Sequence, residues 1–175
     1  YPKLRKGLGG NLNQIICGAS SLSEKIGRFF INTGFPLFEG YGLTEAAPVI
    51  ATNYQDHNRL GTVGPPFPDV EVRISDEGEI LARGPNVMRG YHKDKKATKE
   101  TIDEDGFLHT GDLGSLDEDN YLTITGRKKE LFKKSTGEYG APVPIEQKLS
   151  ESPYIDMAVV IADRRKFPGA LIFPD

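Results

Sequence analysis

The sequence predicts a mixture of α/β and α+β structure. Apolar segments at residues 13–18 and 36–40 flank an amphipathic stretch, which is the strand–helix–strand order of an α/β region. Residues 69–83 and 113–125 alternate apolar and polar side chains around turn residues, as β-hairpins do. We therefore expect three regions: the end of an α/β subdomain at 1–60, a small distorted β-barrel or sheet at 61–126, and the start of a small α+β domain at 127–175.

The first region is expected to hold a buried strand, a helix and a second strand. Cys17 lies in the apolar run "QIICG", which favours a buried structural thiol. Ser21 and Glu24 have the spacing of a capping box, with Ser21 as N-cap and Glu24 at the third helical position. Gly34 is suited to the end of the helix. Its apolar face is predicted to comprise Leu22, Ile26, Phe29 and Phe30.

The second region is expected to be mostly β. Val70, Val72 and Ile74 alternate on one face of a strand over 69–74. The turn residues "DEG" then lead into a return strand over 79–83, and a second hairpin turns near Asp119. Between the hairpins, "KDKKATKE" (93–100) is interpreted as a solvated helix face.

The sequence of the third region predicts a helix followed by two strands. Pro144 is suited to the first turn of a helix over 144–152. Apolar strands over 156–162 and 169–175 follow it.

Composition narrows the classes of function. The 175 residues are 37% hydrophobic and 27% charged, which is typical of a globular protein. A net charge of −3 gives no basic surface for nucleic acid, so we expect no nucleic-acid partner. The single cysteine excludes an internal disulfide framework and fits the reducing cytoplasm. No apolar stretch approaches the roughly 20 residues of a membrane span, and no Cys/His cluster suggests structural zinc.

Three short motifs carry residues suited to binding, yet each has a plain structural interpretation alone. "GYGLTE" (40–45) is compatible with a polar turn, and "GRKKE" (126–130) with a solvated basic loop. "HTGD" (109–112) is compatible with a turn in which Asp112 bonds its own backbone. His109 is expected to pack in a strand near any such site, whereas His57 and His92 belong to surface loops.

The order and spacing of these motifs closely resemble the adenylate-forming superfamily of acyl-CoA synthetases, luciferases and non-ribosomal adenylation domains. The matching segments are "CGASSLS" (17–23), "YGLTE" (41–45), "GEI…RGPNVMRGY" (78–91), "DGFLHTGD" (105–112) and "GRKKELFKKSTGEYGAPVPIE" (126–146). The last of these, with "DRRKFPGALIFPD" (163–175), is most similar to the long-chain fatty-acid–CoA ligase branch. The resemblance implies the adenylate-forming fold and a two-step reaction. ATP and a carboxylate give an acyl-adenylate, and the thiol of CoA then displaces AMP.

The resemblance also implies roles for residues near "GYGLTE". The ring of Tyr41 offers a flat apolar surface to adenine. Thr44 and Glu45 are the implied catalytic pair, with the Thr44 hydroxyl on a phosphate oxygen and Glu45 as a Mg²⁺ ligand. Small residues let the backbone approach the nucleotide or acyl group. The remaining residues implied to line this pocket are Gly18, Ala19, Glu39, Gly40 and Gly42.

Further implied roles fall later in the chain. Asp112 accepts hydrogen bonds from the ribose hydroxyls, and Arg127 offers a permanently charged fork to ribose or phosphate oxygens. Lys129 matches the hinge between a large N-terminal region and a C-terminal domain that rotates between the half-reactions. Gly137 lies in the loop that faces the CoA pantetheine arm.

Two elements of the family pattern are missing from the sequence. The upstream phosphate loop ends in Gly-Lys, and the catalytic lysine near the C-terminus follows a glycine, but this chain has no Gly-Lys dipeptide. We therefore expect both to lie outside these residues, in a longer protein of which this chain is a C-terminal-half fragment, inactive alone. Glu138 also stands where many relatives carry lysine, which is a departure from the family pattern in the CoA-side loop.

Two alternatives to an acyl-CoA ligase stay open at this point. One is an adenylation domain that loads a carrier-protein thiol, and the other is a non-catalytic nucleotide-binding scaffold. For the ligase, the expected partners are small molecules: a fatty acid, ATP and CoA. A cytoplasmic position, with peripheral association at the inner face of the membrane, is compatible with a fatty-acid substrate.

Overall fold

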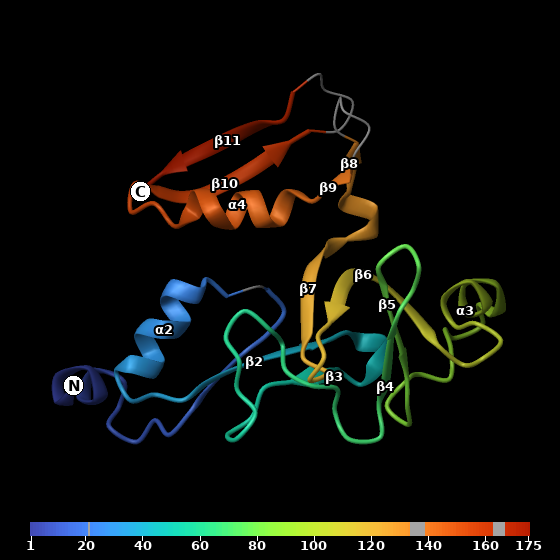
Figure 1. Ribbon diagram of the computed structural model, residues 1–175, viewed down its shortest axis with the longest axis horizontal. Coiled ribbons are helices and arrows are strands. Elements are labelled where there is room, and N and C mark those ends of the chain that lie inside the picture. The colour runs from blue at the N-terminus through green and yellow to red at the C-terminus, as the bar shows by residue number, and fades with distance from the viewer. Residues whose placement is uncertain (21, 134–138, 163–166) are drawn as a thin grey trace.

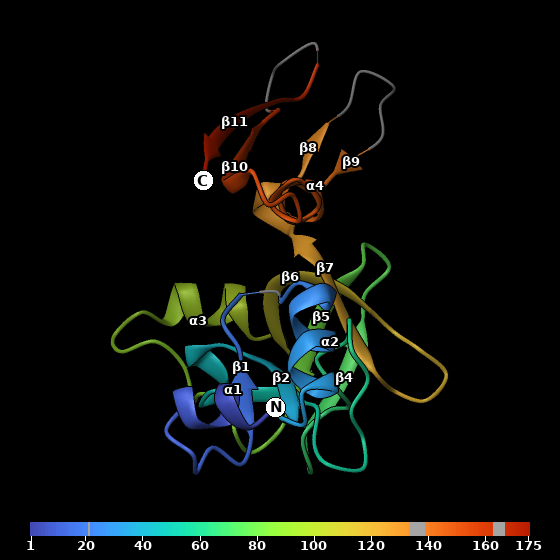
Figure 2. The ribbon, with the colours of Figure 1, turned by 90° about the vertical axis from the view of Figure 1, so that its left-hand side faces the viewer.

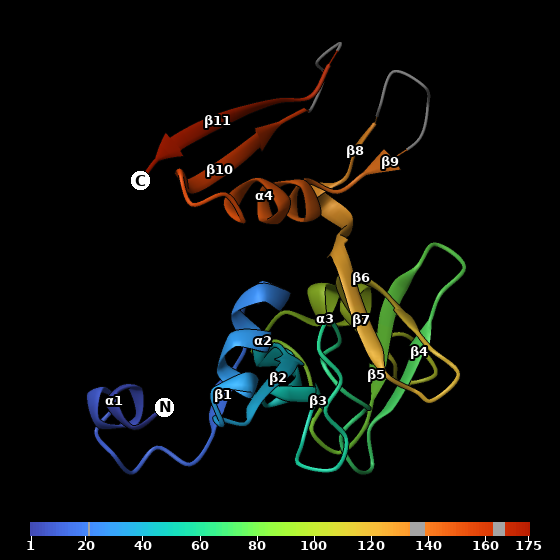
Figure 3. The same ribbon diagram turned by 60° about the vertical axis from the view of Figure 1, so that its left-hand side comes forward.

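A computed structural model describes residues 1–20, 22–133, 139–162 and 167–175. The chain begins with α1 (Pro2–Gly7), which Figure 3 shows set apart from the sheets. Among the helices of the described residues, none has the length and apolar character needed to cross a lipid bilayer.

The first sheet has the order β1-β2-β3, with bounds Ile15–Cys17, Leu37–Gly42 and Val49–Thr52. β1 and β2 are parallel, and α2 (Glu24–Asn32) is the crossover helix between them (Figure 1). β2 and β3 are antiparallel and are joined through the short 3-10 helix η1 (Thr44–Ala46). The predicted strand–helix–strand order is thus confirmed.

The predicted start of α2 is wrong. Its N-cap is Ser23, which makes no side-chain cap hydrogen bond, and Glu24 is the first helical residue rather than the third. Ser21, the predicted N-cap, lies outside the described residues.

The predicted apolar face of α2 is only partly buried, since Ile26 and Phe29 are 48% and 52% exposed. The reason is that Gly27, which is buried, is the point of close approach to the neighbouring loop. A Cβ added at Gly27 would lie 2.8 Å from Cδ2 of Leu60. The helix therefore packs through its smallest residue and leaves these larger side chains on the outside.

The first strand is less buried than predicted. Ile16 is 69% exposed and Cys17 is half-buried, so the expectation of a fully buried strand and thiol is wrong. β1 is the edge strand of its sheet and is hydrogen-bonded on one side to β2, which explains its exposure.

The second sheet has four antiparallel strands in the order β4-β5-β6-β7. Their bounds are Glu71–Ile74, Glu79–Arg83, Leu108–Leu116 and Leu122–Arg127. Both predicted hairpins are confirmed, although β6 begins earlier than expected. The register shifts within the β5–β6 and β6–β7 pairs, and such irregularities bend and twist a sheet. The region is therefore an open, curled sheet.

The core lies between the two sheets, where η1 and β3 pack against the curled sheet. Its fully buried side chains include Ile50 and Leu108 in one cluster and Ile80 and Leu122 in another. Tyr41 packs against both clusters. The two sheets therefore fix the end of β2 relative to β6, which positions the site described below.

The solvated helix predicted between the hairpins is α3 (Lys95–Thr101). Asp94 is its N-cap and accepts a hydrogen bond from the Ala97 N–H at 2.9 Å. None of its residues is buried, which confirms the expectation.

The C-terminal unit follows β7 directly, as Figure 2 shows. The chain passes through the 3-10 helix η2 (Lys128–Glu130) into β8 (Phe132–Lys133), which pairs with β9 (Tyr139–Gly140). Next come α4 (Pro142–Ser150) and the antiparallel strands β10 (Ile155–Ile161) and β11 (Gly169–Pro174). The helix and both strands are confirmed, but α4 starts at Pro142 instead of Pro144, because Pro142 already supplies the preset φ of a first turn.

Candidate functional site

Three side chains from three strands meet at the junction of the two sheets. Tyr41 at the end of β2 donates its hydroxyl hydrogen to Oδ2 of Asp112 in β6 at 2.8 Å. Arg127 at the end of β7 donates from Nε to Oδ1 of the same carboxylate at 3.0 Å. Residues separated by 71 positions in sequence are thus joined at one carboxylate.

The sheet geometry accounts for this meeting. Asp112 and Arg127 are register partners in the β6–β7 pair, so their side chains emerge at the same level. The Asp112 side chain is 11% exposed and that of Arg127 is 67% exposed. The Asp112 carboxylate is therefore largely buried, whereas most of the Arg127 guanidinium is exposed to solvent.

Burial raises the pKa of the Tyr41 hydroxyl far above its ordinary value, and the neighbouring charge of Asp112 raises it further. Tyr41 therefore stays protonated and remains a donor. A carboxylate has about four lone-pair sites, of which Tyr41 and Arg127 use two. Asp112 retains acceptor capacity for two further donors, such as a pair of hydroxyl groups.

Small residues surround the ends of the parallel strands. Gly18 follows β1 and lies against the end of β2, where a Cβ on Gly18 would sit 3.3 Å from the Gly40 carbonyl oxygen. Ala19 next to it adopts a left-handed backbone with φ of 66°. Gly42 is required by the turn itself, because an added Cβ would lie 1.7 Å from the Pro48 carbonyl oxygen. A side chain would therefore crowd the β2 backbone at Gly18 and clash outright with Pro48 at Gly42.

The Glu39 carboxylate, on β2, has different surroundings from Tyr41. Burial raises its pKa, and backbone hydrogen bonds from Leu22 and Gly61 offset part of that effect. Its hydrogen bonds therefore tie β2 to the start of the α2 segment and to the loop after β3.

Thr44 and Glu45 lie in η1, directly after β2. Thr44 is exposed, and Glu45 is half-buried. Tyr91, from the loop before α3, donates its hydroxyl hydrogen to Oε1 of Glu45 at 2.8 Å. The Met88 N–H donates to the Glu45 backbone carbonyl at 2.7 Å. The "GPNVMRGY" loop therefore holds both the backbone and the side chain of Glu45.

Tyr91 was not singled out by the sequence analysis as a site residue. Its hydrogen bond to Glu45 raises the pKa of its hydroxyl, so that Tyr91 stays a donor. The only available signal was its place at the end of the "RGY" motif, because the contact spans 46 positions.

The donor set around Glu45 suits one class of metal ion. No three acidic, histidine or cysteine side chains gather as a metal site anywhere in the described ranges. Mg²⁺ usually takes one or two carboxylates and completes its coordination with waters and substrate phosphates. Glu45, whose Oε2 has no partner among the described residues, fits that requirement when a polyphosphate supplies the other ligands.

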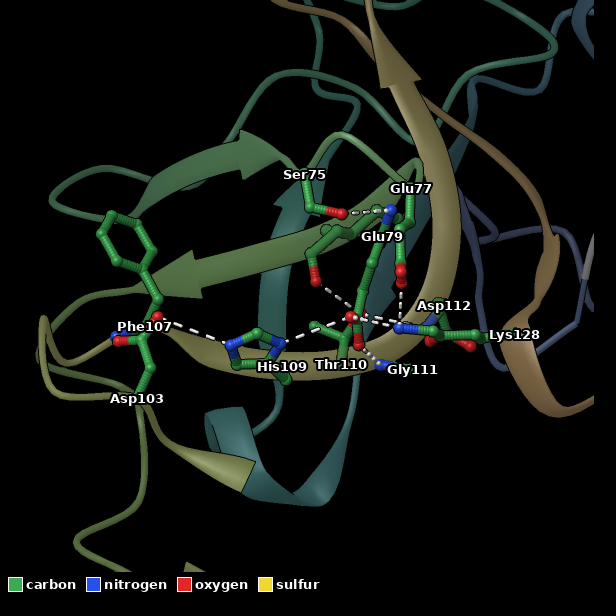
Figure 4. A network of polar contacts seen from close by, with 11 residues as sticks. Ser75, Glu77, Glu79, Asp103, Phe107, His109, Thr110, Gly111, Asp112 and Lys128 are labelled. Carbon is green, nitrogen blue, oxygen red and sulfur yellow. Dashed lines mark hydrogen bonds and ion pairs between the residues drawn. The ribbon is translucent and has the colours of Figure 1, made fainter. Parts of the chain in front are cut away.

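A second buried carboxylate, Glu79 in β5, lies beside β6 and Lys128 and was also missed (Figure 4). Glu79 is 6% exposed, and its Oε1 accepts a hydrogen bond from the Gly111 N–H at 3.0 Å. Its Oε2 lies 3.3 Å from both His109 Nδ1 and Lys128 Nζ. The structure therefore places His109 in β6 as part of a polar network, while His57 and His92 are exposed.

The remaining predicted residues lie after β7. Lys129 is exposed in η2, between the curled sheet and the C-terminal unit. Gly137 lies outside the described residues.

Comparison with known families matches two parts of the chain. Residues 2–92 match the family described as AMP-binding enzyme, and residues 130–175 match the AMP-binding enzyme C-terminal domain. Tyr41 falls in the first matched segment, whereas Asp112 and Arg127 lie between the two.

Curated relatives cover the whole chain. It is 43% identical over 175 residues to the long-chain-fatty-acid–CoA ligase FadD15 of Mycobacterium bovis, covering 100% of this chain and 29% of that protein. It is 38% identical over 178 residues to the peroxisomal long chain acyl-CoA synthetase 6 of Arabidopsis thaliana, covering 93% and 25%. The chain thus spans less than a third of the length of these relatives.

Solved structures share the fold. The o-succinylbenzoate coenzyme A synthetase of Bacillus subtilis in complex with AMP superposes with a TM-score of 0.84 at 28% identity, covering 98% of this chain and 39% of that chain. The same enzyme in complex with ATP and magnesium ion gives a TM-score of 0.82 at 29% identity, covering 97% and 39%.

Proposed function

This chain belongs to the AMP-binding enzyme family, and we propose that it forms part of an ATP-dependent ligase that activates a long-chain fatty acid as an acyl-adenylate and transfers it to CoA. The observation that carries the proposal is the meeting of Tyr41, Asp112 and Arg127 at one buried carboxylate. The two long-chain fatty-acid ligases among the relatives support the substrate class.

The nucleoside part of ATP binds at this carboxylate. Asp112 uses its remaining acceptor sites for the ribose hydroxyls, and Tyr41 offers the face of its ring to adenine. Arg127, with its exposed guanidinium, has donors left over for ribose or phosphate oxygens. Gly18 and Gly40 carry no side chain and Ala19 carries only a methyl group, so the backbone there can approach the adenylate closely.

The phosphates bind near η1. Thr44 offers its exposed hydroxyl to a phosphate oxygen, and Glu45, whose Oε1 accepts from Tyr91, would hold Mg²⁺. A Mg²⁺ bound there neutralises charge on the phosphates. This chain's own part is to fix the Glu45 carboxylate in one orientation, through the contacts from Tyr91 and Met88.

The division into parts follows the same proposal. Residues 1–60 and 61–126 form one side of the nucleotide site, and 127–175 form a domain that turns about Lys129 between the two half-reactions. An exposed lysine in a short 3-10 helix suits a hinge, because few packing contacts have to break when its backbone changes conformation. Gly137 then belongs to the loop that meets the CoA arm.

We place this ligase in the cytoplasm, where it associates peripherally with the inner face of the membrane that contains its fatty-acid substrate. Separating soluble from membrane fractions, with and without a high-salt wash, tests this placement. Release of the protein by salt supports peripheral binding, and a wholly soluble protein at every salt concentration argues against it.

The function is tested with the full-length protein, ATP, Mg²⁺ and a long-chain fatty acid. We expect fatty-acid-dependent exchange of pyrophosphate into ATP, followed by acyl-CoA formation when CoA is added. Acyl transfer to a carrier-protein thiol in preference to CoA would identify an adenylation domain instead. ATP binding without exchange would identify the non-catalytic nucleotide-binding scaffold, and absence of both exchange and ATP binding in the folded protein would also contradict the proposal.

A further inference from the structure

Glu79 is a buried carboxylate to which the proposed function assigns no role. Figure 4 shows it pointing between β6 and the end of β7, where three donors converge on it. Burial by itself raises its pKa, but hydrogen bonds from Gly111, His109 and Lys128 outweigh this effect and hold the pKa below its ordinary value. Glu79 is therefore ionised at neutral pH, as a strong acceptor for all three.

The first contact of Glu79 is a hydrogen bond from Gly111, the residue before Asp112. The β5–β6 pair is irregular here, since Glu79 pairs with Leu113 and Leu81 pairs with His109, so residues 110–112 bulge opposite Ile80 alone. Within this bulge the Gly111 N–H donates to the Glu79 carboxylate instead of a strand carbonyl. A bulge re-aims the side chains that follow it. The contact from Glu79 thereby helps fix the direction of Asp112.

Thr110 completes the local geometry of the bulge. Its hydroxyl donates to the Ile80 carbonyl at 2.8 Å and accepts from the Asp112 N–H at 3.1 Å. The hydrogen bonds of Thr110 and the Gly111 N–H are thus made to β5 or within the bulge itself. Among the described residues, the Glu79 carboxylate is the only charged acceptor of these hydrogen bonds.

The second contact of Glu79 is an ion pair with Lys128, the residue after Arg127. Lys128 Nζ lies 3.3 Å from Oε2 of Glu79 and 2.5 Å from Oε2 of Glu77. Lys128 directly follows Arg127, the last residue of β7, and begins η2, so holding Lys128 restrains the strand end from which Arg127 projects. One carboxylate thus holds both β6 at Gly111 and the end of β7.

We infer that Glu79 is a positioning residue for the nucleotide site: it fixes the bulge that presents Asp112 and, through Lys128, the strand end that presents Arg127. This inference rests on the proposed function. It assigns Glu79 an effect on ribose recognition, and a residue that merely stabilises the sheet would have none.

The test compares ATP with 3′-deoxy-ATP, which lacks one of the hydroxyls that Asp112 is proposed to accept. Full-length wild-type protein, Glu79→Gln, Glu79→Ala, Lys128→Met and Asp112→Ala are assayed for fatty-acid-dependent adenylation with each nucleotide. Glu71→Gln is the matched control, because Glu71 also lies in the curled sheet and pairs with two arginines, but its side chain is 41% exposed and its ion pairs are with Arg73 and Arg83 instead of Lys128.

We expect Glu79→Gln to raise the KM for ATP about tenfold with a smaller change in kcat, the cost of weakening charge-assisted hydrogen bonds that orient a binding group. Its preference for ATP over 3′-deoxy-ATP falls toward the value of Asp112→Ala. Lys128→Met gives a smaller rise in KM, and Glu71→Gln keeps the wild-type values. Glu79→Gln nearly preserves side-chain size, so it provides the result if Glu79→Ala does not fold.

The inference is overturned if Glu79→Gln keeps the wild-type KM and the wild-type preference for ATP while Asp112→Ala loses both. If Asp112→Ala itself keeps the preference, the ribose role of Asp112 in the proposed function fails, and the inference fails with it. A loss of thermal stability in Glu79→Gln with unchanged nucleotide preference assigns Glu79 to the sheet alone and likewise contradicts the inference.

Discussion

Two carboxylates on either side of the proposed nucleotide site are held in different ways. Asp112 is nearly buried and is contacted at both oxygens by Tyr41 and Arg127, in a bulge tied to a second sunken carboxylate. Glu45 stands on a short 3-10 helix and receives one side-chain hydrogen bond, from Tyr91. The chain thus holds the Asp112 carboxylate from two sides before any ligand binds, whereas our proposal leaves the Glu45 site to be completed by the ligand.

The comparison predicts that the largest effect on catalysis comes from Glu45. We expect Glu45→Ala in the full-length protein to lower kcat for adenylation at least about 100-fold, because it removes the proposed metal ligand where charge on the phosphates must be neutralised. Single-turnover formation of the acyl-adenylate measures this. Glu104→Ala, an exposed carboxylate change, is the control. Near-normal turnover in Glu45→Ala would remove Glu45 from the metal site.

Tyr91 sharpens the comparison, because among the described residues it is the one side chain that donates a hydrogen bond to the Glu45 carboxylate. Tyr91→Phe deletes only the hydroxyl, and we expect kcat for adenylation to fall about tenfold, the order of one hydrogen bond to a charged group. A higher Mg²⁺ concentration should restore part of the loss if the carboxylate has become less well oriented. Tyr154→Phe, at a residue 80% exposed, should behave as wild type. A Tyr91→Phe enzyme indistinguishable from Tyr154→Phe would show that Glu45 needs no support.

The smallest expected effect is on the pH dependence of stability. The folded pKa of Glu79 lies below its ordinary value of 4.5, so its ionised form stabilises the fold. The free-energy difference between wild type and Glu79→Gln should be complete above pH 4.5 and should shrink as pH falls through the folded pKa. Urea unfolding at several pH values measures it. A difference that stays constant down to acid pH would mean that the charge of Glu79 contributes nothing.

For Glu39 we expect the opposite pH dependence of stability from that of Glu79. Burial raises its pKa above 4.5, so its contribution to stability is complete below pH 4.5 and is lost as pH rises through the folded pKa. Relative to wild type, Glu39→Gln should therefore gain stability on moving from acid to neutral pH. A change in the same direction as Glu79→Gln would contradict the difference between the two carboxylates.

Local sequence signals predicted most of the fold. Alternation of Val70, Val72 and Ile74 located β4, and Asp119 marked the turn between β6 and β7. Errors arose where tertiary packing outweighed the local pattern. α2 packs through Gly27 rather than through Phe29, a choice that depends on Leu60 in a loop far along the chain.

Some residues of the candidate site were predicted and others were missed, for a related reason. Tyr41, Asp112 and Arg127 belong to recognisable motifs, and the structure brings them within hydrogen-bonding distance. Roles for Tyr91 and Glu79 were not predicted, because they depend on contacts to residues 46 and 32 positions away. No local sequence pattern encodes such contacts. Both residues lie within the matched segment 78–91, but the motif alone does not tell which residues they contact.

The central claim is that Asp112 is the preorganised anchor of a nucleotide site, and equilibrium binding of ATP tests it most directly. Calorimetric titration of the full-length protein should show that Asp112→Asn binds ATP about tenfold or more weakly than wild type, since the neutral amide loses charge-assisted hydrogen bonds. Asp105→Asn, the same change at an exposed turn, should bind as wild type does. Equal ATP affinity in wild type and Asp112→Asn would contradict the account.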